Sequence, residues 1–152
     1  MNKYAKDPQE LRRICANLTF AKQLGLIDDD SLAAAEERCR LENARRGEKL
    51  AAGKVVYGLT AYPLPAYLQY ELTRFRLEFA LPSRTVRDSG YCPEITEAQK
   101  RTFYQENQDL LTRAQGDLFS YEEIEAVIEK RLREAAYDRL VQDILCQSET
   151  RE

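Results

Sequence analysis

The side chains that most often carry acid–base, metal and nucleophilic chemistry are missing from this chain or far apart in its sequence. There is no histidine, which is the commonest general base and metal ligand. No two of the four cysteines form a C-x-x-C pair, whereas zinc sites built from cysteine alone need closely spaced thiolates. The cysteines are Cys15, Cys39, Cys92 and Cys146. Glycine-rich phosphate loops are also missing, so we expect no catalytic residues, no metal and no cofactor.

One cysteine stands apart because it lies in a predicted loop. Cys92 belongs to the segment Gly90-Tyr91-Cys92-Pro93, and we expect it to be the only exposed thiol. An exposed thiol with a lowered pKa can carry redox chemistry, so a thiol redox enzyme that uses Cys92 is the weakest of three functional hypotheses. Cys15 and Cys39 fall on apolar helix faces, where cysteine behaves as a small hydrophobic residue. We therefore expect free thiols unless the protein is exported.

Aromatic residues form the most distinctive group. The chain has nine tyrosines, five phenylalanines and no tryptophan. Tyrosine combines an apolar ring with a polar hydroxyl, which suits a surface that binds protein segments. We predict a peptide- or partner-binding site lined by Tyr57, Tyr62, Tyr67, Tyr70 and Tyr104. The alternative is a role in the core for Tyr67, Tyr70, Phe75 and Phe79.

Composition and charge argue against several classes of function. The chain has 152 residues, of which 43% are hydrophobic and 32% charged; this is typical of a folded globular protein and suits a single domain over 1–152. The net charge of −3, with no long run of Lys and Arg, argues against nucleic-acid binding.

No segment has the roughly 20 apolar residues of a membrane span. The N-terminus lacks the apolar stretch of a signal peptide, so we expect a cytoplasmic protein, or an exported one if a signal has been removed.

Hydrophobic periodicity predicts an all-α fold of about five helices, the last of them long. The predicted helices run from Asp7-Pro8 to Gly25, from about Ser31 to Ala52, from Ala66 to about Leu81, from Glu97 to about Arg113, and from Tyr121 to about Cys146. The segment from Pro82 to Pro93 is the longest predicted loop. In the second helix, the pairs Glu36–Arg40 and Glu42–Arg46 have the (i, i+4) spacing of an exposed, charged face. Its inward candidates are Leu32, Ala35, Cys39 and Leu50.

The last two predicted helices have clear start signals. Thr96 and Ser120 each precede a Gln or Glu by three residues, which is the spacing of a capping box. A turn centred on Gly116 would separate the two helices. Helices joined by a short connection are commonly antiparallel neighbours, so we expect Phe103 and Leu110 to pack on the apolar face of the last helix.

Three segments then follow one another in a suggestive order. They are Leu11-Arg12-Arg13-Ile14 through Gly25-Leu26-Ile27-Asp28-Asp29, Gly58-Leu59-Thr60 with the tyrosine-rich helix to Phe79, and Ile95-Thr96-Glu97 with Phe103-Tyr104-Gln105-Glu106-Asn107. In this order they resemble the chaperone helices, and the helix that leads into the parvulin domain, of the bacterial foldase family that includes SurA and PrsA. The segment Ser120-Tyr121-Glu122-Glu123-Ile124 resembles the helix that leaves that domain.

This resemblance implies a SurA N-terminal-domain-like fold and a peptidyl-prolyl-isomerase-like protein whose parvulin domain is absent between about residues 113 and 120. Because that domain supplies the isomerase site, the resemblance implies that the chain is not an enzyme. The leading hypothesis is a nonenzymatic, chaperone-like module that binds unfolded polypeptide or a protein partner. The alternative is a dedicated assembly or structural subunit of one specific partner, or a homodimer that shares its long last helix.

Overall fold

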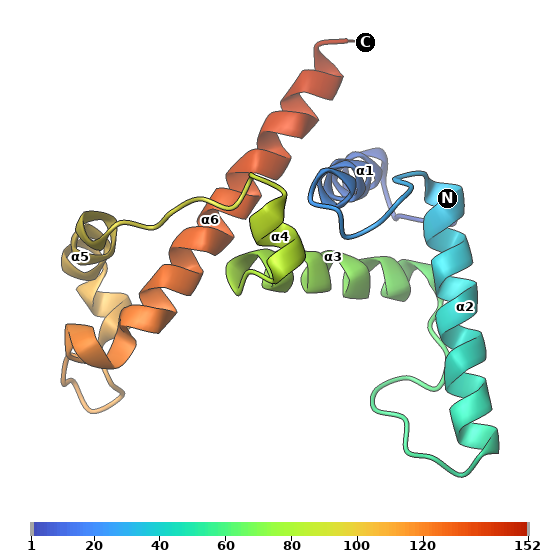
Figure 1. Ribbon diagram of the computed structural model, residues 1–152, viewed down its shortest axis with the longest axis horizontal. Coiled ribbons are helices and arrows are strands. Elements are labelled where there is room, and N and C mark those ends of the chain that lie inside the picture. Colours follow the sequence, from blue (N-terminus) through green and yellow to red (C-terminus); the bar gives the residue numbers. More distant parts are fainter. Residues whose placement is uncertain (1, 152) are drawn as a thin grey trace. The chain divides into compact units, whose positions relative to one another are not determined.

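The computed structural model describes residues 2–151, and these residues form α-helices and one short 3-10 helix (Figure 1). The helices are α1 (Pro8–Gln23), α2 (Leu32–Ala51), α3 (Leu64–Ala80), α4 (Arg84–Asp88), α5 (Glu97–Glu106), η1 (Gln108–Leu111) and α6 (Tyr121–Glu149). Over this range the only β-type pairing is an isolated bridge between Thr112 and Leu118. The predicted all-α fold with a long C-terminal helix is confirmed.

The chain divides into two compact units. Unit 1 comprises the residues up to Phe75 and those from Val141 onward, and unit 2 comprises Arg76–Leu140. Both α3 and α6 contribute residues to each unit. The single domain expected over 1–152 stays a prediction.

In unit 1 the first two helices begin where the sequence predicts. Asp7 Oδ1 accepts a hydrogen bond from the Glu10 amide at 2.8 Å. Ser31 Oγ accepts one from the Ala34 amide at 3.1 Å. These N-caps satisfy amides that have no partner inside the helix. Gly25, with φ of 79°, follows α1 in the left-handed conformation that commonly ends a helix.

The surface charges of α2 pair differently from the prediction. Glu36 binds Lys3 at 2.8 Å, and Arg40 pairs with Glu37. The predicted Glu36–Arg40 pair is therefore wrong, because (i, i+3) neighbours on a helix are as close as (i, i+4) ones and the N-terminal segment supplies a competing cation.

The thiols also differ from the prediction. Cys146 is the exposed cysteine, whereas Cys92 is half-buried. The Cys92 Sγ lies 3.9 Å from the carbonyl oxygen of the following Pro93. The prediction that Cys92 is the only exposed thiol is wrong, because a residue in a loop is not necessarily turned toward solvent.

In unit 2, separate caps divide α5 from α6. The Thr96 amide donates to Gln99 Oε1 at 2.8 Å, and the Gln99 amide donates to Thr96 Oγ1 at 3.2 Å. The Ser120 amide donates to Glu123 Oε2 at 2.8 Å, and the Glu123 amide donates to Ser120 Oγ at 3.4 Å. Gly116 lies in the intervening turn with φ of 94°. Both predicted caps are confirmed.

The α5 helix ends earlier than predicted. It stops at Glu106 rather than near Arg113, and Asn107 leaves the helical conformation while its Nδ2 donates to a carbonyl of the last turn at 2.9 Å. The η1 helix that follows has about three residues per turn. The tighter turn rotates the following side chains around the helix axis, and it leaves Leu110 63% exposed and Leu111 only 4% exposed. The prediction that Leu110 packs on the last helix is wrong, and Leu111 takes that place.

The α5 helix crosses α6 steeply and is not antiparallel to it, since Figure 1 shows α5 almost end-on while α6 lies along the page. Lys100 Nζ lies 2.7 Å from Glu125 Oε1, and the Tyr121 hydroxyl donates to Glu97 at 2.7 Å. Phe103 packs as predicted on the core cluster of unit 2. The buried members of this cluster are Leu111, Tyr121, Ile124 and Ile128. The antiparallel expectation fails because the connection, residues 107–120, is longer than predicted and includes η1.

The predicted loop from Pro82 to Pro93 contains the short helix α4. Ser83 Oγ accepts a hydrogen bond from the Val86 amide at 3.3 Å. The side chain of Val86 is fully buried, so this part of the segment is packed against the protein and is not a free loop.

Candidate functional site

The segment that joins α2 to α3, residues 52–63, is held by a buried arginine. Arg46 is 8% exposed, and its Nη1 donates to the carbonyl oxygens of Tyr57 at 2.7 Å and Leu59 at 2.8 Å. Its Nε donates to Glu42 Oε1 at 3.0 Å. A buried guanidinium is tolerated when acceptors and an opposite charge surround it. Arg46 therefore fixes the path of a segment that has no helix or strand of its own.

Asn43 fixes the end of the same segment. Its Oδ1 accepts from the Tyr62 amide at 2.7 Å, and its Nδ2 donates to the Tyr62 carbonyl at 3.0 Å. Cys39 Sγ lies 3.6 Å from that carbonyl oxygen. Because Cys39, Asn43 and Arg46 are three or four residues apart, they lie on one face of α2. This face holds the segment through its backbone.

Three tyrosines pack together where the segment enters α3. The rings of Tyr62 and Tyr70 are stacked with centroids 5.3 Å apart, and Tyr67 lies 6.0 Å from each of them. The Arg46 guanidinium lies 4.7 Å from the centre of the Tyr62 ring, a favourable cation–π distance. Tyr67 is buried, Tyr62 is half-buried and Tyr70 is exposed. The cluster thus connects the core of unit 1 to its surface.

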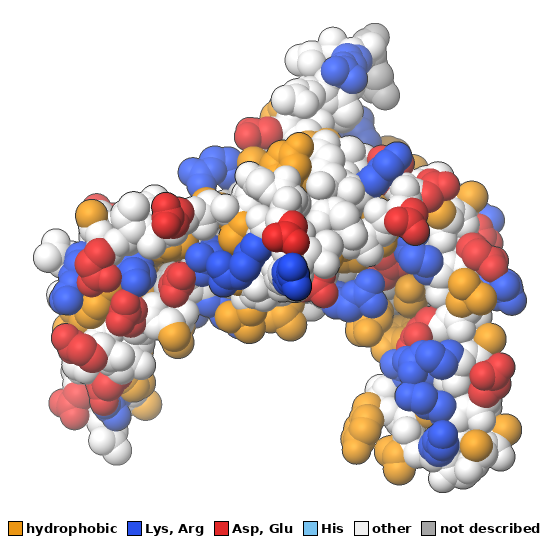
Figure 2. All heavy atoms as spheres, viewed as in Figure 1, with side chains coloured by type: hydrophobic (Ala, Val, Ile, Leu, Met, Phe, Trp, Pro, Cys, Tyr) orange, Lys and Arg blue, Asp and Glu red, His pale blue; other side chains and the backbone are white. Residues whose placement is uncertain are grey.

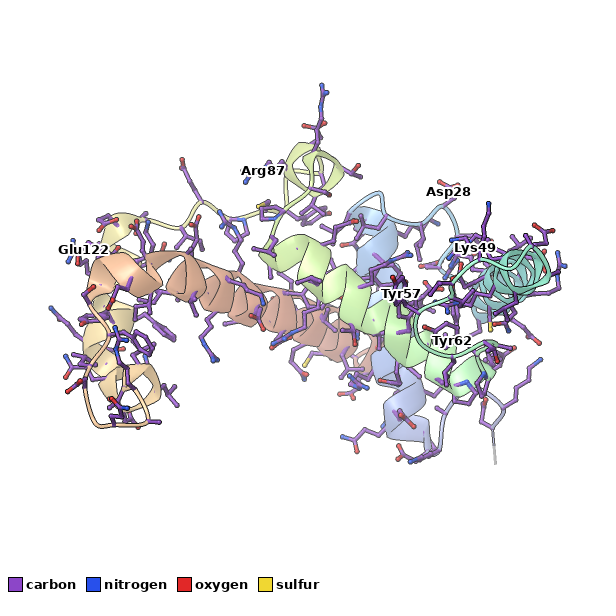
Figure 3. All side chains as sticks on the ribbon, turned by 90° about the horizontal axis from the view of Figure 1, so that it is seen from below. Asp28, Lys49, Tyr57, Tyr62, Arg87 and Glu122 are labelled. Carbon is purple, nitrogen blue, oxygen red and sulfur yellow. The ribbon has the colours of Figure 1, made fainter. Side chains whose placement is uncertain are left out.

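The anchored segment presents apolar side chains to solvent. Tyr57 is 84% exposed, and Val55 and Leu59 are also exposed. With the exposed Leu50 at the end of α2, these residues define the loop surface. Figure 2 shows hydrophobic side chains on the segment between α2 and α3, and Figure 3 labels Tyr57 and Tyr62 there. Exposed apolar residues that are gathered and held in place are typical of a protein-interaction site.

Four of the five predicted binding tyrosines, Tyr57, Tyr62, Tyr67 and Tyr70, belong to unit 1, and the structure brings the last three together. The fifth, Tyr104, belongs to unit 2. Its hydroxyl donates to the Phe119 carbonyl at 2.6 Å, and its ring meets Tyr121 edge-on at 5.8 Å. Partner binding by these tyrosines stays a prediction.

Sequence reasoning missed Arg46 and Asn43. The predicted Glu42–Arg46 pair forms, but Arg46 is buried and does not lie on an exposed face. The signal that could have shown this is the spacing of Asn43 and Arg46, which continue the inward face begun by Cys39. The predicted inward position of Leu50 is wrong, since that side chain is 43% exposed.

A buried ion pair joins α2 to α3 in unit 1. Glu71 is fully buried, and its two carboxylate oxygens accept from Arg38 Nε at 2.9 and 3.2 Å. Arg38 Nη1 also donates to the Asp29 carbonyl at 3.2 Å. Burial, and then the neighbouring Glu71 carboxylate, raises the pKa of Tyr67 above its usual value. The pair therefore fixes α2 against the helix that carries Tyr67 and Tyr70.

Replacing Arg46 by Ala is expected to lower the free energy of unfolding by about 1.5–3 kcal/mol, the range for hydrogen bonds to charged groups. Chymotryptic cleavage after Tyr57 and Leu59 should become faster, because the anchor of their carbonyl oxygens is gone. Arg45→Ala is the matched control, since Arg45 is exposed and binds the same Glu42. Unchanged cleavage in the Arg46 variant would show that the segment is held by other contacts.

Among residues 2–151, no group of three or more His, Cys, Asp or Glu side chains could hold a metal ion. No helix in that range is long and apolar enough to span a bilayer.

Comparison with known proteins places these features in context. No family model matches the chain. A curated relative from Bifidobacterium longum subsp. longum, named a chaperone for lacto-N-biosidase, is 27% identical over 132 residues. This alignment covers 87% of the chain but only 45% of the relative.

Two solved structures are similar in fold and sequence. Both are of a GH136 lacto-N-biosidase from Eubacterium ramulus, one native and one a selenomethionine derivative. The native structure matches with a TM-score of 0.75 and 28% identity, over 89% of this chain and 27% of the solved chain. The derivative matches with a TM-score of 0.76 and 27% identity, over 91% of this chain and 28% of the solved chain.

These findings show that the predicted resemblance to the foldase family that includes SurA and PrsA is wrong. The peptidyl-prolyl-isomerase-like and SurA-like parts of the prediction are wrong with it, and the idea of a missing parvulin domain has no other support. The resemblance failed because caps and short apolar periodicities are required of any helix and therefore recur in unrelated helical proteins. The chain is instead similar, over most of its length, to a chaperone for lacto-N-biosidase and to part of a GH136 lacto-N-biosidase chain.

Proposed function

We propose that this chain is a nonenzymatic chaperone dedicated to one glycoside hydrolase, an enzyme related to the GH136 lacto-N-biosidases. The observation that carries the proposal is its similarity, over 87% of its length, to a protein named a chaperone for lacto-N-biosidase. Because the chain spans less than half of that relative, the partner and the activity are part of the proposal.

The solved relatives add a second line of support. There, a segment similar to this chain is part of the same polypeptide as a lacto-N-biosidase. A module linked to its partner has a high effective concentration and needs little affinity of its own. In this chain, the loop surface offers exposed apolar residues for contact with such an enzyme.

The construction of the loop surface favours one partner over many unfolded clients. Arg46 and Asn43 hold the segment before any partner binds, and such preorganisation lowers the entropic cost of binding one complementary surface. Promiscuous binding proteins more often use flexible, methionine-rich surfaces, whereas this chain contains one methionine. Dedicated binding, the alternative hypothesis from the sequence, is therefore better supported than general polypeptide binding.

Co-expression tests the proposal. A lacto-N-biosidase from Bifidobacterium longum, and the Eubacterium ramulus enzyme lacking the matched segment, would each be produced with this chain or with an empty vector. We expect at least one enzyme to yield severalfold more soluble, active protein with the chain, and to co-purify with it. No gain and no co-purification for both enzymes would contradict the proposal.

Two leucine variants locate the contact. Leu59→Ser changes the loop surface, and Leu41→Ser changes a leucine of similar exposure elsewhere in unit 1 (49% and 53% exposed). Leu59→Ser, and more strongly Tyr57→Ser, should reduce the yield of active enzyme. Equal yields with Leu59→Ser and Leu41→Ser would exclude the loop surface as the binding site.

A further inference from the structure

Unit 2 contains a pocket of about 370 Å³ that the proposed function does not use. The end of α3, the short helix α4 and the middle of α6 line it. Its charged lining residues are Arg87, Glu129, Lys130 and Arg133. Three cations and one carboxylate give this lining an excess of positive charge, and Figure 2 shows Lys and Arg side chains gathered beside α4.

Arg133 forms the buried wall of the pocket. Its side chain is 10% exposed, and its Nη1 donates to Glu129 Oε1 at 2.6 Å. Its Nε is buried and has no hydrogen-bond partner in the part of the chain that the structure describes. Buried donors are nearly always satisfied, so this guanidinium has unused capacity for an acceptor.

Lys130 and Arg87 add charge that is not neutralised locally. Over residues 2–151, the Lys130 ammonium makes no hydrogen bond or ion pair. Within the same described range, Arg87, labelled in Figure 3, donates its Nε only to the Pro82 carbonyl at 3.3 Å. An anion entering the pocket would thus meet a guanidinium and an ammonium that both have free donors, which are the groups that bind carboxylates and phosphates in proteins.

We propose that this pocket binds a single oxyanionic group, either the carboxylate of an acidic side chain or a free phosphate. Apolar side chains, Ala80, Leu81, Pro82 and Ala126, complete the lining, so the group can carry a short apolar neighbour. The volume lies at the lower end of the range for small-molecule sites. This inference does not depend on the hydrolase partner, because it concerns unit 2 alone.

Titrations of the full chain by NMR test the proposal. The probes are inorganic phosphate, the dipeptide acetyl-Ala-Glu-amide and its neutral counterpart acetyl-Ala-Gln-amide. Phosphate, the Glu dipeptide or both should shift the Arg133 side-chain Nε resonance, and the shift should weaken with added NaCl because salt screens the attraction. Binding of the Glu dipeptide alone identifies an acidic side chain as the source, and binding of phosphate alone identifies a free anion.

A lysine variant separates the pocket from general surface charge. Lys130→Gln should weaken binding about fivefold, the upper range for one ion pair that is partly exposed, and should leave the fold intact because Lys130 has no partner to lose. Lys54→Gln, an exposed lysine in unit 1, makes the same charge change and should leave the affinity unchanged. The proposal is overturned if neither phosphate nor the Glu dipeptide binds, or if the Gln dipeptide binds and does so as tightly as the Glu dipeptide. It is also overturned if both variants have the same affinity.

Discussion

Replacing Glu71 by Ala is expected to lower the free energy of unfolding by about 3 kcal/mol, the lower end of the range for breaking a buried ion pair, because the Arg38 side chain that loses its partner is 24% exposed. Arg38 would lose both hydrogen bonds to the carboxylate. Its Nη2 is already buried without a partner among the described residues, so the arginine has no ready replacement. Urea unfolding followed by circular dichroism, with linear extrapolation to water, measures the change.

Two further variants make this prediction specific. Glu37→Ala removes an exposed carboxylate from α2 that binds Arg40 at the surface, and it should have little effect. The double variant Arg38→Met, Glu71→Leu replaces both charges by apolar side chains and should recover most of the lost stability. A loss for Glu71→Ala no greater than that for Glu37→Ala would show that the pair contributes little.

Replacing Leu111 by Ala is expected to lower the free energy of unfolding by about 2–5 kcal/mol, the range for truncating a buried leucine. The neighbouring Leu110→Ala should change it by less than about 0.5 kcal/mol, as is usual for exposed positions. The two variants have the same composition and differ by one position, so thermal or urea unfolding compares them directly. A larger loss for Leu110→Ala would mean that Leu110, and not Leu111, faces the core, as it would if α5 continued as an α-helix through this segment.

The features that the sequence predicted well are local ones. Asp7, Ser31, Thr96 and Ser120 cap helices as expected, because a cap depends on two residues only three apart in the chain. The all-α class followed equally directly, since apolar residues recur at helical spacing over long stretches.

The features that were missed depend on contacts between distant parts of the chain. Arg46 looks like one half of a surface ion pair, and only the fold shows that it meets the carbonyl oxygens of Tyr57 and Leu59. Leu110 and Leu111 are chemically identical, and their exposure depends on how Asn107 ends α5. The tyrosines were identified as a group from composition, yet their division between the two units follows from the fold.

The way in which Arg46 holds the loop has a consequence for evolution. Its guanidinium binds main-chain oxygens at positions 57 and 59, and every amino acid supplies such an oxygen. Substitutions at these two positions can therefore alter the chemistry of the loop surface while the scaffold keeps its shape. Under the proposed function, related chains could be retargeted to diverging enzymes by changing a few side chains, in the way that antibody loops are varied on a constant framework.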